Sequence, residues 1–253
     1  MKPRKKCVFC GNDAGKISGE HIWSAWIGRL FTSTAYTWTY VDPQTGEAQV
    51  RDFKTIDFTI NDVCKPCNEG WLSRLEARAK LAFSEMIQKP VEFSLLPSGA
   101  VLLAAFAFKS AIIATCMNKS REAFFTPAAR LRFKNSLEIP PGVQMWLARF
   151  SGGAASSGLF IGNVLGANAP KDNHLHGLEL YSFTYVAGRL VLQVLAPKWE
   201  NILKRGRPLP MLVPSGAWDS VSTRFWPNQG LPISWPPEKY LGDDSINAFV
   251  NLT

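Results

Sequence analysis

The sequence predicts an α+β fold in two parts, a small metal-binding module over residues 1–90 and a larger α+β domain over residues 91–253. Two CxxC pairs, at residues 7–10 and 64–67, lie within the first part. The second part contains a long apolar segment and then runs of alternating apolar residues, which are typical of a buried helix and antiparallel strands. A chain of 253 residues, 46% of them hydrophobic, is long enough to bury such a core.

Four of the five cysteines belong to the CxxC pairs, CVFC and CKPC. The charged N-terminus is followed by a cysteine pair and not by the apolar run of a secretory signal, so we expect a cytoplasmic protein with reduced thiols. Two CxxC turns can supply the four thiolates of a tetrahedral zinc site, whereas unpaired thiols and a redox pair are the alternatives. The predicted ligands of a structural zinc ion are Cys7, Cys10, Cys64 and Cys67.

Between and after these pairs the pattern changes from strand to helix. Two candidate strands, 35–41 and 48–59, flank a turn-like DPQTG segment. After the second pair, WLSRLEARAKLAFSEMI places apolar residues on one face of a helix. The second CxxC pair is therefore expected to lead directly into a helix.

In the larger part, residues 101–117 form an apolar run with a single charge, Lys109, at its middle. The run is short for a membrane span, and a central lysine is costly in lipid, so a buried helix that starts near Ser98 and ends near Asn118 is expected, with no membrane contact. Alternating apolar runs from Gly142 onwards predict strands, and Ala187-Gly188 predicts the turn of a hairpin.

The segment GEHI, between the cysteine pairs, places a carboxylate next to an imidazole. On a regular strand Glu20 and His21 would point to opposite faces, whereas at a bulge or a strand end both can approach one site. A hydrogen-bonded core histidine beside a solvated glutamate is the alternative interpretation.

The ordered set CVFC, GEHI and NDVCKPCN followed by a helix resembles the HNH endonuclease family in its zinc-stapled form. EHIWSAW and CKPCNEGWLSRLE are also similar to uncharacterised bacterial and phage proteins that are identified as HNH endonucleases. The resemblance covers residues 7–80 and implies a ββα-metal, treble-clef-like module that hydrolyses phosphodiester bonds in DNA.

Carried over to this sequence, the resemblance implies that His21 is a general base and that Glu20 and Asn68 bind a catalytic divalent ion, Mg²⁺ or alternatively Mn²⁺ or Ni²⁺. Asn61 would orient His21. The sequence departs from the family pattern in three ways: Asn61 lies only three residues before Cys64, Asn68 stands where many members have histidine, and Trp23 replaces a proline common after this motif.

A net charge of +8 and a pI near 9.3 favour a polyanionic partner, and the resemblance makes double-stranded DNA the expected one. The candidate phosphate contacts are Lys5, Lys6, Lys65 and Arg74. Two other hypotheses fit the same sequence. The chain could be a non-catalytic zinc-knuckle protein that binds nucleic acid or protein, or the C-terminal domain could carry the function while the zinc knot caps it.

Overall fold

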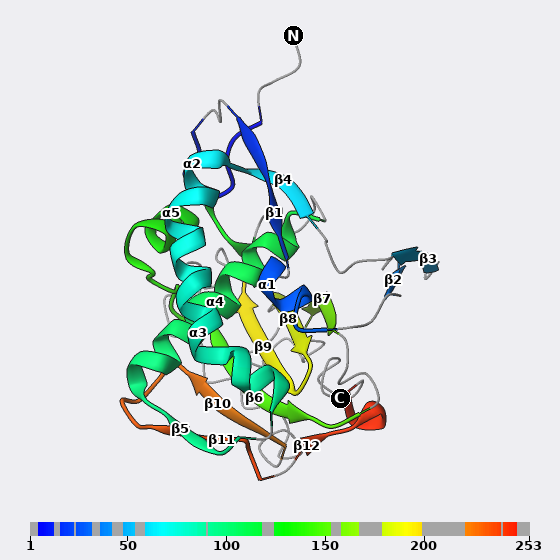
Figure 1. Ribbon diagram of the computed structural model, residues 1–253. Coiled ribbons are helices and arrows are strands. Elements are labelled where there is room, and N and C mark those ends of the chain that lie inside the picture. The colour runs from blue at the N-terminus through cyan, green and yellow to red at the C-terminus, as the bar shows by residue number, and fades with distance from the viewer. Residues whose placement is uncertain are drawn as a thin grey trace, which may run out of the picture.

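The computed structural model has an α+β architecture with antiparallel sheets, as the sequence predicts (Figure 1). An N-terminal cysteine-rich region lies at one end of the molecule, and a larger sheet with a long helix against it forms the other end. The residues that the structure describes are 5–12, 16–22, 24–31, 36–41, 48–53, 59–89, 91–117, 124–152, 158–166, 179–198, 221–238 and 240–246.

The N-terminal region is built on a long-range strand pair. β1 (Ile17–His21) pairs antiparallel with β4 (Thr59–Cys64), and the register shifts between Ser18 and Glu20. Ser18 is opposite Val63 and Glu20 is opposite Ile60, so the one extra residue of the shift is on β4. A bulge of this kind bends the strand and redirects side chains. The chain between the two strands forms a short helix, α1 (Ala25–Gly28), and a hairpin of β2 (Tyr36–Val41) and β3 (Ala48–Phe53).

The helix predicted after the second CxxC pair is present and starts inside the pair. It runs through α2 (Lys65–Cys67), a π-helical turn η1 (Asn68–Leu72) and α3 (Ser73–Gln88). Gly70 departs from helical geometry, with φ −91° and ψ −106°, and marks a kink in this otherwise continuous segment. The buried residues of α3 recur at helical spacing: Leu75, Ala79, Phe83, Met86 and Ile87.

A six-stranded sheet forms the centre of the larger part, in the order β10-β6-β9-β8-β7, and β12 adds to β6 in parallel. Its hairpin of β8 and β9 turns at Gly188, which has a positive φ of 54°, as the Ala187-Gly188 pattern predicts. A separate two-stranded sheet joins β5 to β11. The strands are β5 (Phe93–Leu95), β6 (Gln144–Phe150), β7 (Gly158–Gly166), β8 (Glu179–Ala187), β9 (Leu190–Pro197), β10 (Ser222–Trp226), β11 (Ile233–Trp235) and β12 (Tyr240–Leu241).

The sheet is apolar on both faces, and α4 (Pro97–Thr115) packs against one of them. In β6 the alternation is clear, because Met145 and Leu147 join the cluster around α4, whereas Trp146 and Ala148 join a smaller cluster on the other face. The first cluster extends without a break from the cysteine region into the sheet.

Among the described residues α4 is the one helix long and apolar enough to cross a membrane, but most of it is buried inside the protein, as in the core helix of a soluble protein. It ends three residues before the predicted Asn118. Next along the chain, α5 (Pro127–Ser136) begins at Thr126, whose hydroxyl oxygen accepts a hydrogen bond from the Ala129 N–H at 3.2 Å. It ends at Leu137, which is left-handed with φ 57°.

Candidate functional site

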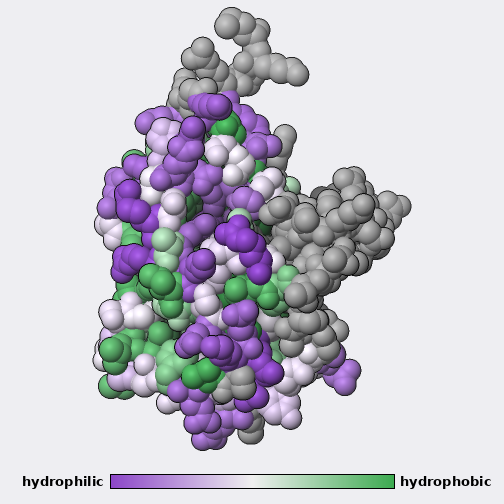
Figure 2. All heavy atoms as spheres, viewed as in Figure 1, coloured by the Kyte–Doolittle hydropathy of each residue, from purple (hydrophilic) through white to green (hydrophobic). Residues whose placement is uncertain are grey.

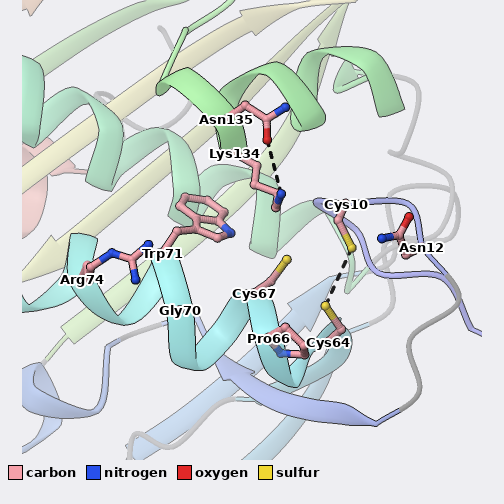
Figure 3. A pocket seen from close by; sticks show the side chains of 10 residues that line it. All are labelled: Cys10, Asn12, Cys64, Pro66, Cys67, Gly70, Trp71, Arg74, Lys134 and Asn135. Carbon is pink, nitrogen blue, oxygen red and sulfur yellow. Dashed lines mark hydrogen bonds between the residues drawn. The ribbon is translucent and has the colours of Figure 1, made fainter.

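The four predicted zinc ligands lie together. The sulfur atoms of Cys7, Cys10, Cys64 and Cys67 are all within 4.8 Å of one another. Cys10 Sγ and Cys64 Sγ are 3.8 Å apart (Figure 3), which is close to the separation of about 3.8 Å that a tetrahedron with Zn–S bonds of about 2.3 Å requires. The cysteines therefore form a four-thiol cluster that can hold a metal ion, and its ligand set is the one that zinc prefers.

Tight turns hold the first pair in place. The Gly11 N–H donates to the Cys7 carbonyl at 2.9 Å, and Gly11 itself is left-handed with φ 69°, a conformation that favours glycine. The Val8 N–H donates to the Asp62 carbonyl at 2.8 Å and so ties the first turn to β4. The Cys64 N–H points to Cys7 Sγ at 3.4 Å, which is the kind of contact that stabilises a thiolate.

The thiol pKa values show why this cluster needs a cation. Burial alone would raise the pKa of Cys7, but hydrogen bonds, the strongest from the backbone at Cys10 and Cys64, outweigh it and lower the pKa to about 7. At Cys67, burial and the neighbouring sulfur atoms both raise the pKa, and Cys64 shifts in the same direction mainly because it is buried. The thiolates of Cys64 and Cys67 are therefore disfavoured in this cluster, and a bound divalent cation would offset that cost.

A second polar cluster lies below β1. Lys109, at the middle of the apolar helix α4, is fully buried and forms ion pairs with Glu20 Oε1 at 2.5 Å and Glu76 Oε1 at 2.7 Å. The Ser24 hydroxyl donates to Glu76 Oε1 at 2.6 Å, and Lys109 Nζ also donates to the His21 carbonyl at 3.2 Å. β1, α3 and α4, distant in sequence, therefore meet at a single buried ammonium group, which we call the lysine cluster.

Two carboxylates share one ammonium group here, and their pKa values shift in opposite directions. Burial raises the pKa of Glu20, and the attraction of Lys109 offsets this only in part. Burial acts in the same sense on Glu76, but Lys109 and the Ser24 hydroxyl outweigh it and lower the pKa. Burial would lower the pKa of Lys109, yet the two carboxylates raise it, so the ammonium stays charged.

His21 is the last residue of β1 and is half-buried beside the lysine cluster. A positive charge on its imidazole would lower the pKa of both Glu20 and Glu76, so the three side chains share one electrostatic environment. The register shift of β1 lies directly before this pair, and His21 is at the strand end.

Asn68 connects the helical segment to β1. Its Nδ2 donates to Ser18 Oγ and to the Gly19 carbonyl, both at 2.9 Å. Gly19 immediately precedes Glu20, so Asn68 lies beside the strand that carries the Glu20-His21 pair although it is 49 residues further along the chain. Asn61 occupies the shifted part of β4 and is exposed; among the described residues its side chain makes no hydrogen bond, while its carbonyl accepts from Lys5 at 3.1 Å.

The predicted phosphate contacts fall into two groups. Lys5 forms an ion pair with Asp62 at 3.1 Å and Lys65 with Glu69 at 3.3 Å, so both have partners within the chain. Arg74 has no ion pair among the described residues and lines a pocket beside the cysteines, and Lys6 is exposed.

The partners of Glu20 are not evident from the sequence. Lys109 is an isolated charge in an apolar helix, and such a charge requires a buried counter-charge. No local pattern indicates that the counter-charges come from β1 and α3. The carboxylate that was expected to hold a catalytic divalent ion is instead paired with an ammonium group.

No family model matches the chain, and neither a curated protein nor a solved structure is similar to it at a significant level.

Proposed function

We propose that the chain is an HNH-type, metal-dependent endonuclease, with a zinc-stapled, treble-clef-like ββα module over β1, β4 and the helical segment α2–α3. The observation that carries the proposal is the hydrogen bond from Asn68 to the carbonyl of Gly19, the residue before Glu20. Asn68 thereby contacts the strand that carries Glu20 and His21, although it comes from a distant part of the sequence. Asn68 directly follows Cys67 of the four-cysteine cluster. Double-stranded DNA is the proposed substrate because the chain has a net charge of +8.

In this mechanism His21 accepts the proton of the attacking water, since an imidazole can be neutral and basic near neutral pH. Lys109 donates a hydrogen bond to the His21 carbonyl and forms an ion pair with the side chain of Glu20, the residue before it. Lys109 therefore positions the end of β1. Asn68 holds the same strand at a second carbonyl group, that of Gly19. The imidazole is thus carried by a backbone that is held at two carbonyl groups.

A catalytic divalent ion fits this site less well than the zinc fits the cysteines. Glu20 is 2% exposed and already paired with Lys109, so a second cation on that carboxylate would be repelled. Asn68 keeps its side-chain oxygen for an ion, since only its nitrogen is used in the contacts with β1. Mg²⁺, Mn²⁺ or Ni²⁺ would neutralise charge on the phosphate when bound.

Replacing His21 by alanine is expected to lower the rate of plasmid nicking about 100-fold or more, because general-base catalysis contributes at least that factor. The measurement is nicking in the presence of Mg²⁺, Mn²⁺ or Ni²⁺, with zinc content determined on the same samples. Thr59→Ala is the matched control, since Thr59 pairs with His21 in β4 and is exposed. Unchanged nicking by His21→Ala with zinc retained would remove His21 from the mechanism.

A non-catalytic zinc module that binds nucleic acid is the second candidate, and the Glu20–Lys109 ion pair favours it. If the lysine has permanently replaced a catalytic cation, DNA binding should persist without hydrolysis under any divalent ion. Binding that weakens steeply with salt, together with no nicking by the wild-type protein, would select this second function over the first.

A further inference from the structure

An open pocket of about 560 Å³ lies beside the four-cysteine cluster, between the helical segment after Cys64 and the last turn of α5. Trp71, Arg74 and Lys134 line this pocket together with three of the cysteines. In Figure 3 Lys134 lies on the side of Trp71 that faces the sulfur atoms, and Arg74 lies on the other side of the indole ring. On the surface, hydrophilic residues predominate over this end of the molecule (Figure 2). The pocket is thus on a different side of the helical segment from Asn68 and Glu76, which face β1 and the lysine cluster.

The two cations of the pocket lack counter-charges. Neither Arg74 nor Lys134 forms an ion pair among the described residues, and the one polar side-chain contact of Lys134 is with the neutral Asn135, at 3.3 Å. Lys5 and Lys65, on the same N-terminal region, both have carboxylate partners. Within the described part of the chain, the pocket therefore holds two positive charges that no acidic side chain neutralises.

Trp71 adds an uncharged donor to the same pocket. Its ring is held edge-to-face by Phe9 at 5.0 Å and by Phe133 at 5.7 Å, so the indole is fixed between the first cysteine turn and α5. Its Nε1 is buried and has no hydrogen-bond partner in the described part of the chain. Figure 3 shows this nitrogen directed towards the space between Cys67 and Lys134. A buried donor without an acceptor is costly, and a bound ligand oxygen would satisfy it.

We propose that Trp71, Arg74 and Lys134 form a phosphate-binding site for the backbone of a nucleic acid. A guanidinium group, an ammonium group and an indole N–H line one pocket, and phosphate oxygens along a nucleic-acid backbone accept hydrogen bonds from groups of each kind. The phosphate site rests on the proposed function only for the choice of nucleic acid as the partner. The site requires that the chain bind nucleic acid, not that it hydrolyse it. The proposed phosphate site is on the helical segment that also contacts β1 through Asn68.

The test is the affinity of the full chain for a short fluorescent DNA duplex as a function of salt, without divalent ions. Arg74→Gln/Lys134→Gln is expected to lower the slope of log K against log salt by about 2 and the affinity on the order of 10- to 100-fold at about 0.1 M salt. Trp71→Phe is expected to weaken binding about tenfold with the slope unchanged, because it removes an uncharged donor.

The matched control is Arg78→Gln/Arg132→Gln, which removes the same charge from the exposed surfaces of α3 and α5 without touching the pocket. Equal slopes for the two double variants would overturn the site, because the effect would then be one of overall charge. Zinc loss from the pocket variant, with normal binding by Trp71→Phe, would assign the cations to compensation of the thiolate charge and would also overturn it.

Two further outcomes separate this site from the nuclease proposal. Nicking by the wild-type protein, with normal DNA binding by the pocket variants, would leave the endonuclease standing and remove the phosphate site. DNA binding that depends on the pocket residues, without nicking, would support the phosphate site and contradict the endonuclease proposal. Quenching of tryptophan fluorescence by inorganic phosphate, lost in Trp71→Phe, with no binding of the duplex, would show a site for small phosphates and overturn the backbone contact.

Discussion

Replacing Cys64 by serine is expected to release the bound metal and to unfold the N-terminal region, the largest effect of any single change in this chain. Cys64 joins the metal cluster to β4 and also marks the start of the helical segment, so its loss separates the strand pair from the helix. Structural zinc sites contribute on the order of 10–16 kcal/mol of apparent binding free energy in small zinc domains, more than a typical domain holds in reserve.

The measurement is zinc content per chain by elemental analysis, together with thermal unfolding followed by circular dichroism. Cys116→Ser is the control, since Cys116 lies outside the cluster and its thiol donates to the Ile112 carbonyl, at 3.5 Å. The control should keep one zinc ion and its melting temperature, and treatment of the wild-type protein with a chelator should reproduce the Cys64→Ser result. A Cys64→Ser protein that binds one zinc ion with an unchanged melting temperature would exclude the four-thiolate site.

The metal cluster was predictable from the sequence because two short motifs carry almost all of its geometry. Each CxxC turn places two sulfur atoms locally, and the requirement for four thiolates then brings the two turns together. The helix after Cys67 and the hairpin at Gly188 were predictable for a similar reason, since each depends on residue spacing within about one or two dozen positions.

The surroundings of Glu20 were not predictable in this way. β1 pairs with β4 across the hairpin of β2 and β3, so the strand that carries Glu20 finds its partner about 40 residues later. Lys109 comes from a helix 88 residues beyond His21, and its charge is compensated only once three elements have packed together. Periodicity identified α4 as buried, but not which carboxylates its lysine would meet.

The arrangement places two different environments on the two sides of one helical segment. Asn68 and Glu76 face β1 and the lysine cluster, whereas Trp71 and Arg74 face the pocket beside the cysteines. The kink at Gly70 lies between Asn68 and Trp71, where the π-helical turn changes the direction of successive side chains. The four-cysteine cluster lies at the start of a helical segment that both proposed sites share. Disruption of the cluster should therefore disable both sites.

Replacing Lys109 by methionine is expected to destabilise the protein by about 3–5 kcal/mol, because it leaves Glu20 buried without a counter-charge. Methionine fills a similar volume, so the cost reports the charge and not a cavity. The measurement is urea unfolding near pH 7. Lys80→Met, an exposed lysine on α3, is the control and should change the free energy of unfolding by less than about 0.5 kcal/mol.

The double variant Glu20→Gln/Lys109→Met should recover part of that loss, since the buried carboxylate is gone and Glu76 remains partly solvated, with its side chain 23% exposed. Lys109 and Glu76 each contribute a pH dependence of definite sign in the wild-type protein, and the raised pKa of Glu20 opposes that of Glu76. The raised pKa of Lys109 means that its contribution is complete below pH 10.5 and declines as the pH rises through the higher folded value. The lowered pKa of Glu76 makes its contribution complete above pH 4.5 and lost on acidification. A Lys109→Met protein as stable as the wild type at pH 7, with no gain from Glu20→Gln, would show that the ion pair does not hold β1 against α4, and the positioning role given to Lys109 would then fail with it.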